Sequence, residues 1–233
     1  MKPIPYRRAL IIGAGTGISA SLARRLRSEG LEVALAARDV DKLKAFAEET
    51  GARTFAADAA DEGSVRDLFA QVDQTLGEPD VVIYNAGRRA HGSITEINPD
   101  AFRQAWAVTA FGAFLAAQQA ARRMIPQGKG AIFFTGATAS VKGFALSAAF
   151  ATGKFGLRGL AQSVARELSP QGIHVAHFII DGGVESEERK SSERPPDSML
   201  SPDAIAESYV DVLSQHRSAW SFEVELRPWL EKF

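Results

Sequence analysis

The sequence predicts an α/β protein in which a doubly wound parallel sheet of seven strands lies between two layers of helices, α/β/α. Two observations support this prediction. Short apolar runs rich in Val, Ile, Leu and Phe alternate with longer amphipathic stretches, and a cluster of glycines stands where the first run ends. With 233 residues and 45% hydrophobic content, the chain is expected to form one compact domain over residues 1–233.

Seven apolar runs have the length and composition of buried strands. In chain order, they cover residues 9–12, 33–37, 54–56, 81–84, 131–135, 174–180 and 222–226. The stretches between them contain helix start and stop signals. Asn98 and Ser201 each precede a proline, which is typical of an N-cap followed by the first helical residue. Three glycines are expected to end helices: Gly30, Gly51 and Gly172.

One segment has no apolar face. Residues 185–198 read ESEERKSSERPPDS, which is polar, highly charged and interrupted by two prolines. Such a composition cannot pack against a sheet, so a mobile loop is expected here.

Composition excludes several classes of function. The net charge is -1, and no basic stripe alternates with aromatic residues, so neither nucleic acid nor an anionic membrane is an expected partner. The chain has no cysteine, which excludes disulfides, thiolate catalysis and cysteine-ligated zinc, and no metal site is expected. No apolar run is long enough for a signal-peptide core or a membrane helix, so the expected location is cytoplasmic.

The first chemical signal is the glycine cluster after the first predicted strand. Gly13, Gly15 and Gly17 lie between an apolar run and an amphipathic stretch, with Thr16 and Ile18 beside them. Glycines at this position let backbone amides approach a pyrophosphate, which the following helix N-terminus attracts. The alternative is a tight turn that needs glycine for steric reasons alone. The position in the first turn favours a dinucleotide site.

Two further positions bear on the adenosine half of such a ligand. Arg38 follows the second predicted strand, where an arginine pairs with a 2′-phosphate, and this predicts NADP(H) in preference to NAD(H). The alternatives are a solvated arginine, or a ribose contact from Asp39. Asp58, beside Ala59, follows the third strand and is placed to accept a hydrogen bond from the adenine amine, or else to cap the next helix.

These blocks, in this order and spacing, resemble the short-chain dehydrogenase/reductase family over residues 7–186. Asn85, Ala86 and Gly87 are similar to the family's Asn-Ala-Gly turn, and residues 161–175 are similar to its helix and strand after the active-site lysine. The resemblance implies a Rossmann-type sheet in the order 3-2-1-4-5-6-7, with the cofactor across the carboxyl ends of the strands. It also implies that further cofactor contacts come from Asn85, Ala86, Gly87, Lys154, Gly182 and Val184.

The catalytic positions depart from the family pattern. Where the family has Tyr-x-x-x-Lys, this chain has Phe150 and Lys154, while Ala137 stands at the serine position and Thr109 at the asparagine position. Phe150 cannot donate or accept a proton. Lys154 is expected to reach the cofactor ribose or to exchange protons itself, the alternative being a solvated helix lysine.

Other polar residues could in principle replace the missing phenol, although each is more often a cap, turn or surface residue. They are Thr138, Ser140, Ser147, His91 and Asp181. Asp181 most often forms an Asx turn in such a position, and His177, inside an apolar strand, is expected to be a satisfied core histidine.

Two functions follow from the sequence. One is an NADP(H)-dependent oxidoreductase whose small-molecule substrate needs no protein phenol, for example an activated C=C bond. The other is a catalytically inactive NADP(H)-binding protein that acts as a sensor or structural partner. A homodimer or homotetramer is expected through residues 100–124 and 150–168, because these segments carry many apolar residues. They are Phe102, Trp106, Phe111, Phe114, Phe155, Leu157 and Leu160.

Overall fold

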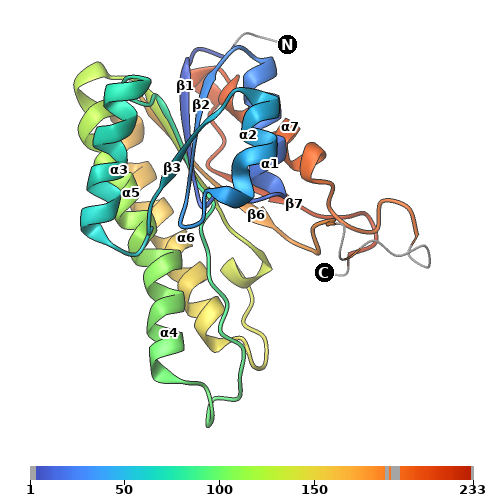
Figure 1. The fold of residues 1–233 in the computed structure, drawn as a ribbon. Coiled ribbons are helices and arrows are strands. Elements are labelled where there is room, and N and C mark those ends of the chain that lie inside the picture. The colour runs from blue at the N-terminus through green and yellow to red at the C-terminus, as the bar shows by residue number, and fades with distance from the viewer. Residues whose placement is uncertain (1–3, 187–188, 190–194, 232–233) are drawn as a thin grey trace.

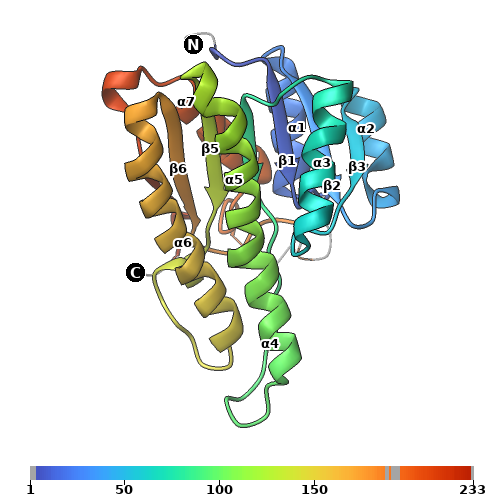
Figure 2. The same ribbon diagram turned by 90° about the vertical axis from the view of Figure 1, so that its left-hand side faces the viewer.

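The computed structural model describes residues 4–186, 189 and 195–231. They form a seven-stranded sheet in the order β3-β2-β1-β4-β5-β6-β7, and neighbouring strands are parallel throughout. Helices cover both faces of this sheet (Figures 1 and 2). The predicted α/β/α fold class is confirmed, including the strand order. The order reverses between β1 and β4, which creates a crevice at the carboxyl ends of these strands.

The strands match the predicted runs to within one residue at each end. They are β1 (Arg8–Ile12), β2 (Glu32–Ala37), β3 (Arg53–Ala56), β4 (Val81–Tyr84), β5 (Gly130–Thr135), β6 (Ile173–Ile180) and β7 (Glu223–Leu226). All residues of β4, β5 and β6 are buried, because helices cover both of their faces. This explains why these strands are continuous apolar runs rather than alternating ones.

One face of the sheet is covered by α1 (Ile18–Ser28), α2 (Lys44–Thr50) and α7 (Pro202–Leu213). Packing here includes two aromatic rings from β6 and α7. Phe178 and Tyr209 stack with centroids 3.6 Å apart at 11°. The Tyr209 hydroxyl also shares a 2.8 Å hydrogen bond with the Thr135 hydroxyl, so its polar end is satisfied inside the core.

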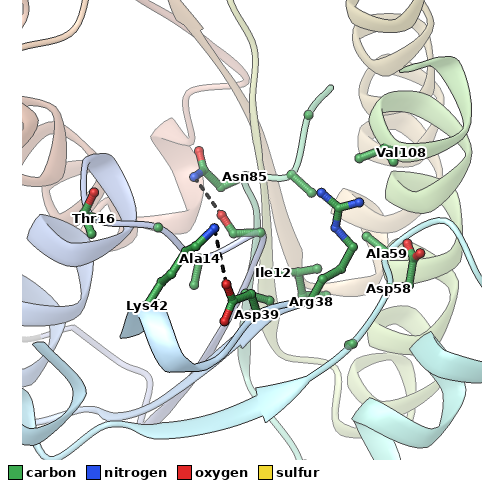
Figure 3. A pocket seen from close by; sticks show the side chains of 16 residues that line it. Ile12, Ala14, Thr16, Arg38, Asp39, Lys42, Asp58, Ala59, Asn85 and Val108 are labelled. Atoms are coloured by element: carbon green, nitrogen blue, oxygen red, sulfur yellow. Dashed lines mark hydrogen bonds and ion pairs between the residues drawn. The ribbon is translucent and has the colours of Figure 1, made fainter. Parts of the chain in front are cut away.

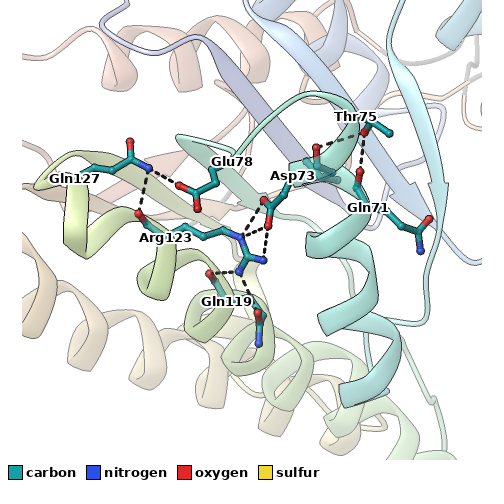
Figure 4. Close-up of polar contacts among 8 residues, drawn as sticks. Gln71, Asp73, Thr75, Glu78, Gln119, Arg123 and Gln127 are labelled. Atoms are coloured by element: carbon teal, nitrogen blue, oxygen red, sulfur yellow. Dashed lines mark hydrogen bonds and ion pairs between the residues drawn. The ribbon is translucent and has the colours of Figure 1, made fainter.

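The other face is covered by α3 (Glu62–Thr75), α5 (Gly112–Met124) and α6 (Ala148–Leu168), while α4 (Pro99–Trp106) projects beyond the sheet (Figure 2). A partly buried ion pair joins α3 to α5 (Figure 4). The Arg123 guanidinium donates to both carboxylate oxygens of Asp73, over 2.7–3.0 Å, and lies over the Phe69 ring. This planar two-point contact fixes the spacing of the two helices.

The predicted helix ends are largely confirmed. The Asn98 side chain accepts from the N–H groups of Asp100 and Ala101, and Ser201 accepts from Ala204. The glycines that were expected to end helices all have positive φ: Gly30, Gly51 and Gly172. The predicted helix over residues 100–124 is not uniform, because a π-helical turn at Ala107–Phe111 separates α4 from α5.

The predicted mobile loop lies partly outside the described residues, since residues 187–188 and 190–194 are not described. The residues that flank it are paired. The Glu185 N–H donates to the Leu200 carbonyl, and the Leu200 N–H donates to the Gly183 carbonyl. Within the described part of the chain, no helix has the length and apolarity needed to cross a membrane.

Candidate cofactor and active site

A cavity of about 380 Å³ opens at the carboxyl ends of β1, β2 and β4, at the point where the strand order reverses (Figure 3). Nine of the sequence-predicted cofactor residues line it: Gly13, Gly15, Thr16, Arg38, Asp58, Ala59, Asn85, Ala86 and Gly87. Five others do not line this cavity: Gly17, Ile18, Lys154, Gly182 and Val184. Gly17 and Ile18 nevertheless begin α1 directly after the lining residues.

Gly13 is required by the protein's own backbone. Its φ is +85°, and a Cβ there would lie 2.3 Å from the backbone nitrogen of Ala86. The Asn85 amide donates to the Gly13 carbonyl at 3.3 Å and to the Ser19 hydroxyl at 2.8 Å. The turn after β1 and the turn after β4 are therefore packed against each other and joined by one side chain, which fixes the shape of the cavity.

Gly15 and Gly17 have no such structural reason. Neither has a positive φ, and a Cβ at either position would meet nothing within 4 Å. Gly17 is the N-cap of α1, where no side chain caps the helix and the first turn contains no acidic residue. The first N–H groups of α1 therefore lack a side-chain partner, and they carry partial positive charge. These glycines leave room for an anion to approach the amides, as the pyrophosphate of a dinucleotide requires.

Three charged residues stand at the adenosine end, after β2. Arg38 and Asp39 both line the cavity, and so does Lys42, which the sequence analysis did not single out. The Lys42 ammonium lies 3.2 Å from the Asp39 carboxylate (Figure 3). Asp39 also accepts a hydrogen bond from the Asp41 N–H. Its charge is therefore offset locally, whereas Arg38 makes no ion pair with any described residue.

Asp58 does not cap the helix that follows it. That position belongs to Asp61, whose carboxylate accepts from the Ser64 N–H at the start of α3. The Asp58 carboxylate instead accepts from the Ala60 N–H, forming a local turn at the cavity wall. Of the two alternatives left open for this residue, helix capping is therefore excluded, and the adenine contact stays a prediction.

A second group of residues lies around Lys154. This lysine is only 5% exposed, and its ammonium donates to the Thr135 carbonyl at 2.6 Å. Burial, and then the charge of Arg89, lowers the pKa of Lys154 to about 8. The alternative of a solvated helix lysine is therefore wrong. A Cβ at Gly87 would lie 3.7 Å from the Lys154 nitrogen and 3.9 Å from the Thr109 hydroxyl. The turn after β4, which contains Gly87, therefore meets α6 and the π turn at this point.

Thr109 and Phe150 face this group from two elements. Thr109 is fully buried in the π turn, and its hydroxyl accepts from the Arg88 N–H at 3.3 Å. Two cations lie near the Phe150 ring, with the Lys154 nitrogen 5.8 Å and the Arg89 guanidinium carbon 4.6 Å from its centroid. Arg89 was missed in the sequence, where an arginine in a loop looks like any solvated cation.

Several alternative proton donors are occupied by structural contacts. The Ser140 hydroxyl is buried and accepts from the Ala137 N–H, which closes the turn after β5. The Asp181 carboxylate lies 2.5 Å from the Arg227 guanidinium, so it forms an ion pair. His177 is buried beside Glu223, and burial lowers its pKa to about 4, so it is neutral near pH 7.

A glycine turn after β1 and a cation after β2, at the carboxyl edge of a parallel sheet, define a dinucleotide-binding protein. The family model for short chain dehydrogenase matches residues 7–196. The chain therefore belongs to the short-chain dehydrogenase family of oxidoreductases, whose members bind nicotinamide cofactors.

Individual relatives agree with this assignment. A short-chain dehydrogenase/reductase of Armillaria gallica is 36% identical over 180 residues, which cover 74% of this chain and 69% of the relative. The crystal structure of a short-chain dehydrogenase from Rhodopseudomonas palustris has a TM-score of 0.82 at 36% identity, over 96% of this chain and 99% of that one. A metagenomic short-chain oxidoreductase in complex with NADP has a TM-score of 0.84 at 28% identity, over 97% and 98% of the two chains.

Proposed function

We propose that the protein is an NADP(H)-dependent oxidoreductase whose active site works without the family's tyrosine. The observation that supports catalysis best is the burial of Lys154 beside Gly87 and Thr109. Burying an ammonium is unfavourable, and a protein that merely held a nucleotide would gain little from it. A lysine with a pKa of about 8 is protonated at neutral pH yet able to exchange its proton, which suits a general acid.

The cofactor preference rests on charge at the adenosine end of the cavity. Arg38 is available to pair with a 2′-phosphate, and the Asp39 carboxylate, the alternative ribose ligand, is engaged by Lys42. Two cations and one offset carboxylate favour the doubly charged phosphate of NADP(H) over a free hydroxyl. The NADP bound to the metagenomic relative is consistent with this preference.

The side chains present limit the chemistry. Phe150, Ala137 and Thr109 stand at the family's Tyr, Ser and Asn positions by resemblance, and neither the ring nor the methyl group can donate a hydrogen bond to a carbonyl oxygen. When bound, the dinucleotide supplies or accepts a hydride. The reaction that suits this site is reduction of an activated C=C bond, in which the hydride adds to one carbon and the other carbon is protonated by water or by Lys154.

The same substitutions favour a second candidate function, a nucleotide-binding protein without hydride transfer that acts as a sensor or structural partner. A protein that no longer transferred hydride would not need the Tyr and Ser hydroxyls of the family, which Phe150 and Ala137 replace here. The two candidates differ in their need for Lys154. Replacing it with Met should lower turnover in the oxidoreductase, whereas a structural partner has no turnover to lose.

The cofactor site is tested by fluorescence titration of NADPH into the wild type and Gly15→Val. Because nothing lies within 4 Å of a Cβ at Gly15, the variant should keep its thermal stability but bind NADPH at least about tenfold more weakly. Gly143→Val is the matched control, since it also has open space around it and lies outside the cavity lining. Equal NADPH binding in all three proteins would contradict the proposed site.

A reductase screen over enones and carbonyl compounds then separates the two candidate functions.

A further inference from the structure

Two cations approach one aromatic ring, and neither forms an ion pair with a described residue. The Arg89 guanidinium lies over the Phe150 ring at 4.6 Å, and the Lys154 ammonium lies 5.8 Å from the same ring. Both contacts are attractive, because a ring face carries partial negative charge. Their arrangement nevertheless places two positive charges on one side chain, and Arg89 is close enough to contribute to the lowered pKa of Lys154.

Carboxylates that could offset these charges are engaged elsewhere. Asp181 pairs with Arg227, and Glu223 is shared by Arg158 and His177. Among the described residues, Arg89 forms no ion pair, and the Lys154 ammonium has a carbonyl oxygen as its hydrogen-bond acceptor. In the described part of the chain, no carboxylate therefore forms an ion pair with either cation on the substrate side of the site. Lys154 is buried and Arg89 is exposed, so an anionic group would gain from one desolvated cation and from one that solvent also reaches.

The phosphates of the cofactor are expected at the other end of the site, away from these cations. The cavity lining extends along the turn after β4 only as far as Gly87, and it contains neither Arg88 nor Arg89. The expected phosphate-binding residues lie elsewhere: Gly15 and Gly17 lie in the turn between β1 and α1, and Arg38 directly follows β2. Arg89 therefore stands past the end of the cofactor turn, next to the residues that replace the family's catalytic side chains.

We propose that Arg89 binds a carboxylate of the substrate, and that the substrates of this site are carboxylic acids. The planar guanidinium presents two parallel N–H groups that match the two oxygens of a carboxylate. Stacking on Phe150 holds that plane in position, so the arginine loses less freedom on binding. The inference deepens the proposed oxidoreductase function, because it identifies the substrate by its charge, and it makes Arg89 a specificity-determining residue.

The test compares three acids with their neutral amides by isothermal titration calorimetry: cinnamate, trans-2-hexenoate and 2-oxobutyrate. Each is titrated into the protein saturated with NADP⁺, which cannot supply a hydride, and into the nucleotide-free protein. The wild type should bind acids at least tenfold more tightly than amides in one or more pairs, and Arg89→Leu should reduce this ratio to near one. The Kd of NADPH should be unchanged in Arg89→Leu, because Arg89 lies outside the cavity lining.

Arg88→Leu is the matched control. It removes the same charge one residue away, and Arg88 contacts the site through its backbone N–H, which the substitution keeps. The control should retain the preference for acids. If Arg89→Leu and Arg88→Leu lowered the preference for acids equally, the cause would be the total charge of the loop and the proposal would be wrong. The proposal would also be overturned if wild type showed no preference for the acid in any of the three pairs. Failure of NADPH to bind would contradict the proposed function instead, and the nucleotide-free titrations would still decide the role of Arg89.

Discussion

The Lys154 ammonium donates a 2.6 Å hydrogen bond to the carbonyl oxygen of Thr135, the last residue of β5. This contact ties the fourth residue after Phe150 on α6 to the carboxyl edge of the sheet. One carbonyl does not replace the water that an ammonium loses on burial, and the nearby Arg89 adds repulsion. The position of the amine is therefore fixed, while its proton is held less tightly than on an ordinary lysine.

We expect this to give a pH-dependent stability. The folded-state pKa of Lys154, about 8, is below the ordinary value of 10.5, so the unfolded chain binds more protons between these two values. The burial of the charged amine destabilises the fold at neutral pH, and this cost decreases as the pH rises. Denaturant unfolding should show that wild type gains about 2 kcal/mol relative to Lys154→Met between pH 7 and pH 10. A difference independent of pH would mean that the amine is hydrated.

Arg38 should determine the choice of cofactor. Wild type is expected to bind NADPH at least about tenfold more tightly than NADH, or roughly 1.4 kcal/mol. Arg38→Asp should reverse the preference, because aspartate repels the 2′-phosphate and accepts from a free hydroxyl. Arg53→Asp, on the exposed start of β3 and outside the cavity lining, is the control for net charge. Fluorescence titration measures all three proteins, and equal affinities in wild type would contradict the prediction.

Restoring the missing hydroxyls tests the active site. Phe150→Tyr places a phenol within range of two cations, so its pKa should be depressed below that of a free tyrosine. Combined with Ala137→Ser, it should raise carbonyl reduction on the order of 10²-fold, if proton transfer limits turnover. Steady-state kinetics with NADPH and a panel of ketones measures this. Substantial carbonyl reduction by wild type would instead show a substitute donor, to be found by single replacement of Lys154, Thr138, Ser147 and His91.

Association is expected through α4, α5 and α6. Trp106, Phe114 and Phe155 are 43%, 40% and 45% exposed, and Phe111 stacks between the first two. Aromatic surface of this extent is typical of an interface. Light scattering should find a dimer or tetramer at micromolar concentration, and the pair Phe114→Glu with Phe155→Glu should shift it towards monomer. Phe144→Glu, at an exposed aromatic outside these helices, should leave the oligomer intact. A wild-type monomer would refute the prediction.

Much of the fold could be predicted from the sequence because its cause is local. Strands buried on both faces must be continuous apolar runs, which is the case for β4, β5 and β6. All seven observed strands lie within one residue of the predicted runs, including the exposed edge strands β3 and β7. The π turn could not be predicted, because residues 107–111 read AVTAF and contain no Gly or Pro to mark a break. Its geometry depends on tertiary packing instead, with Thr109 pressed against Gly153 of α6.

The candidate site was predicted in part for a similar reason. The glycines and Arg38 have recognisable positions relative to the strands, whereas Arg89 has no such position. Lys42 engages Asp39 across three residues of a turn, which the spacing alone could have indicated. Arg89 and Phe150 are 61 positions apart in the sequence and belong to different elements, so no local sequence pattern predicts their contact.

The π turn at Ala107–Phe111 holds one residue more than an α-helical turn would. Because the wider turn absorbs the extra residue locally, a single-codon deletion here would let the helix run straight while α4 and α5 kept nearly the same faces. The deletion would instead change the local position of Thr109, which contacts Gly153 and accepts from the Arg88 N–H. The number of residues in this stretch, rather than their chemical type, therefore sets how the helix reaches the candidate site.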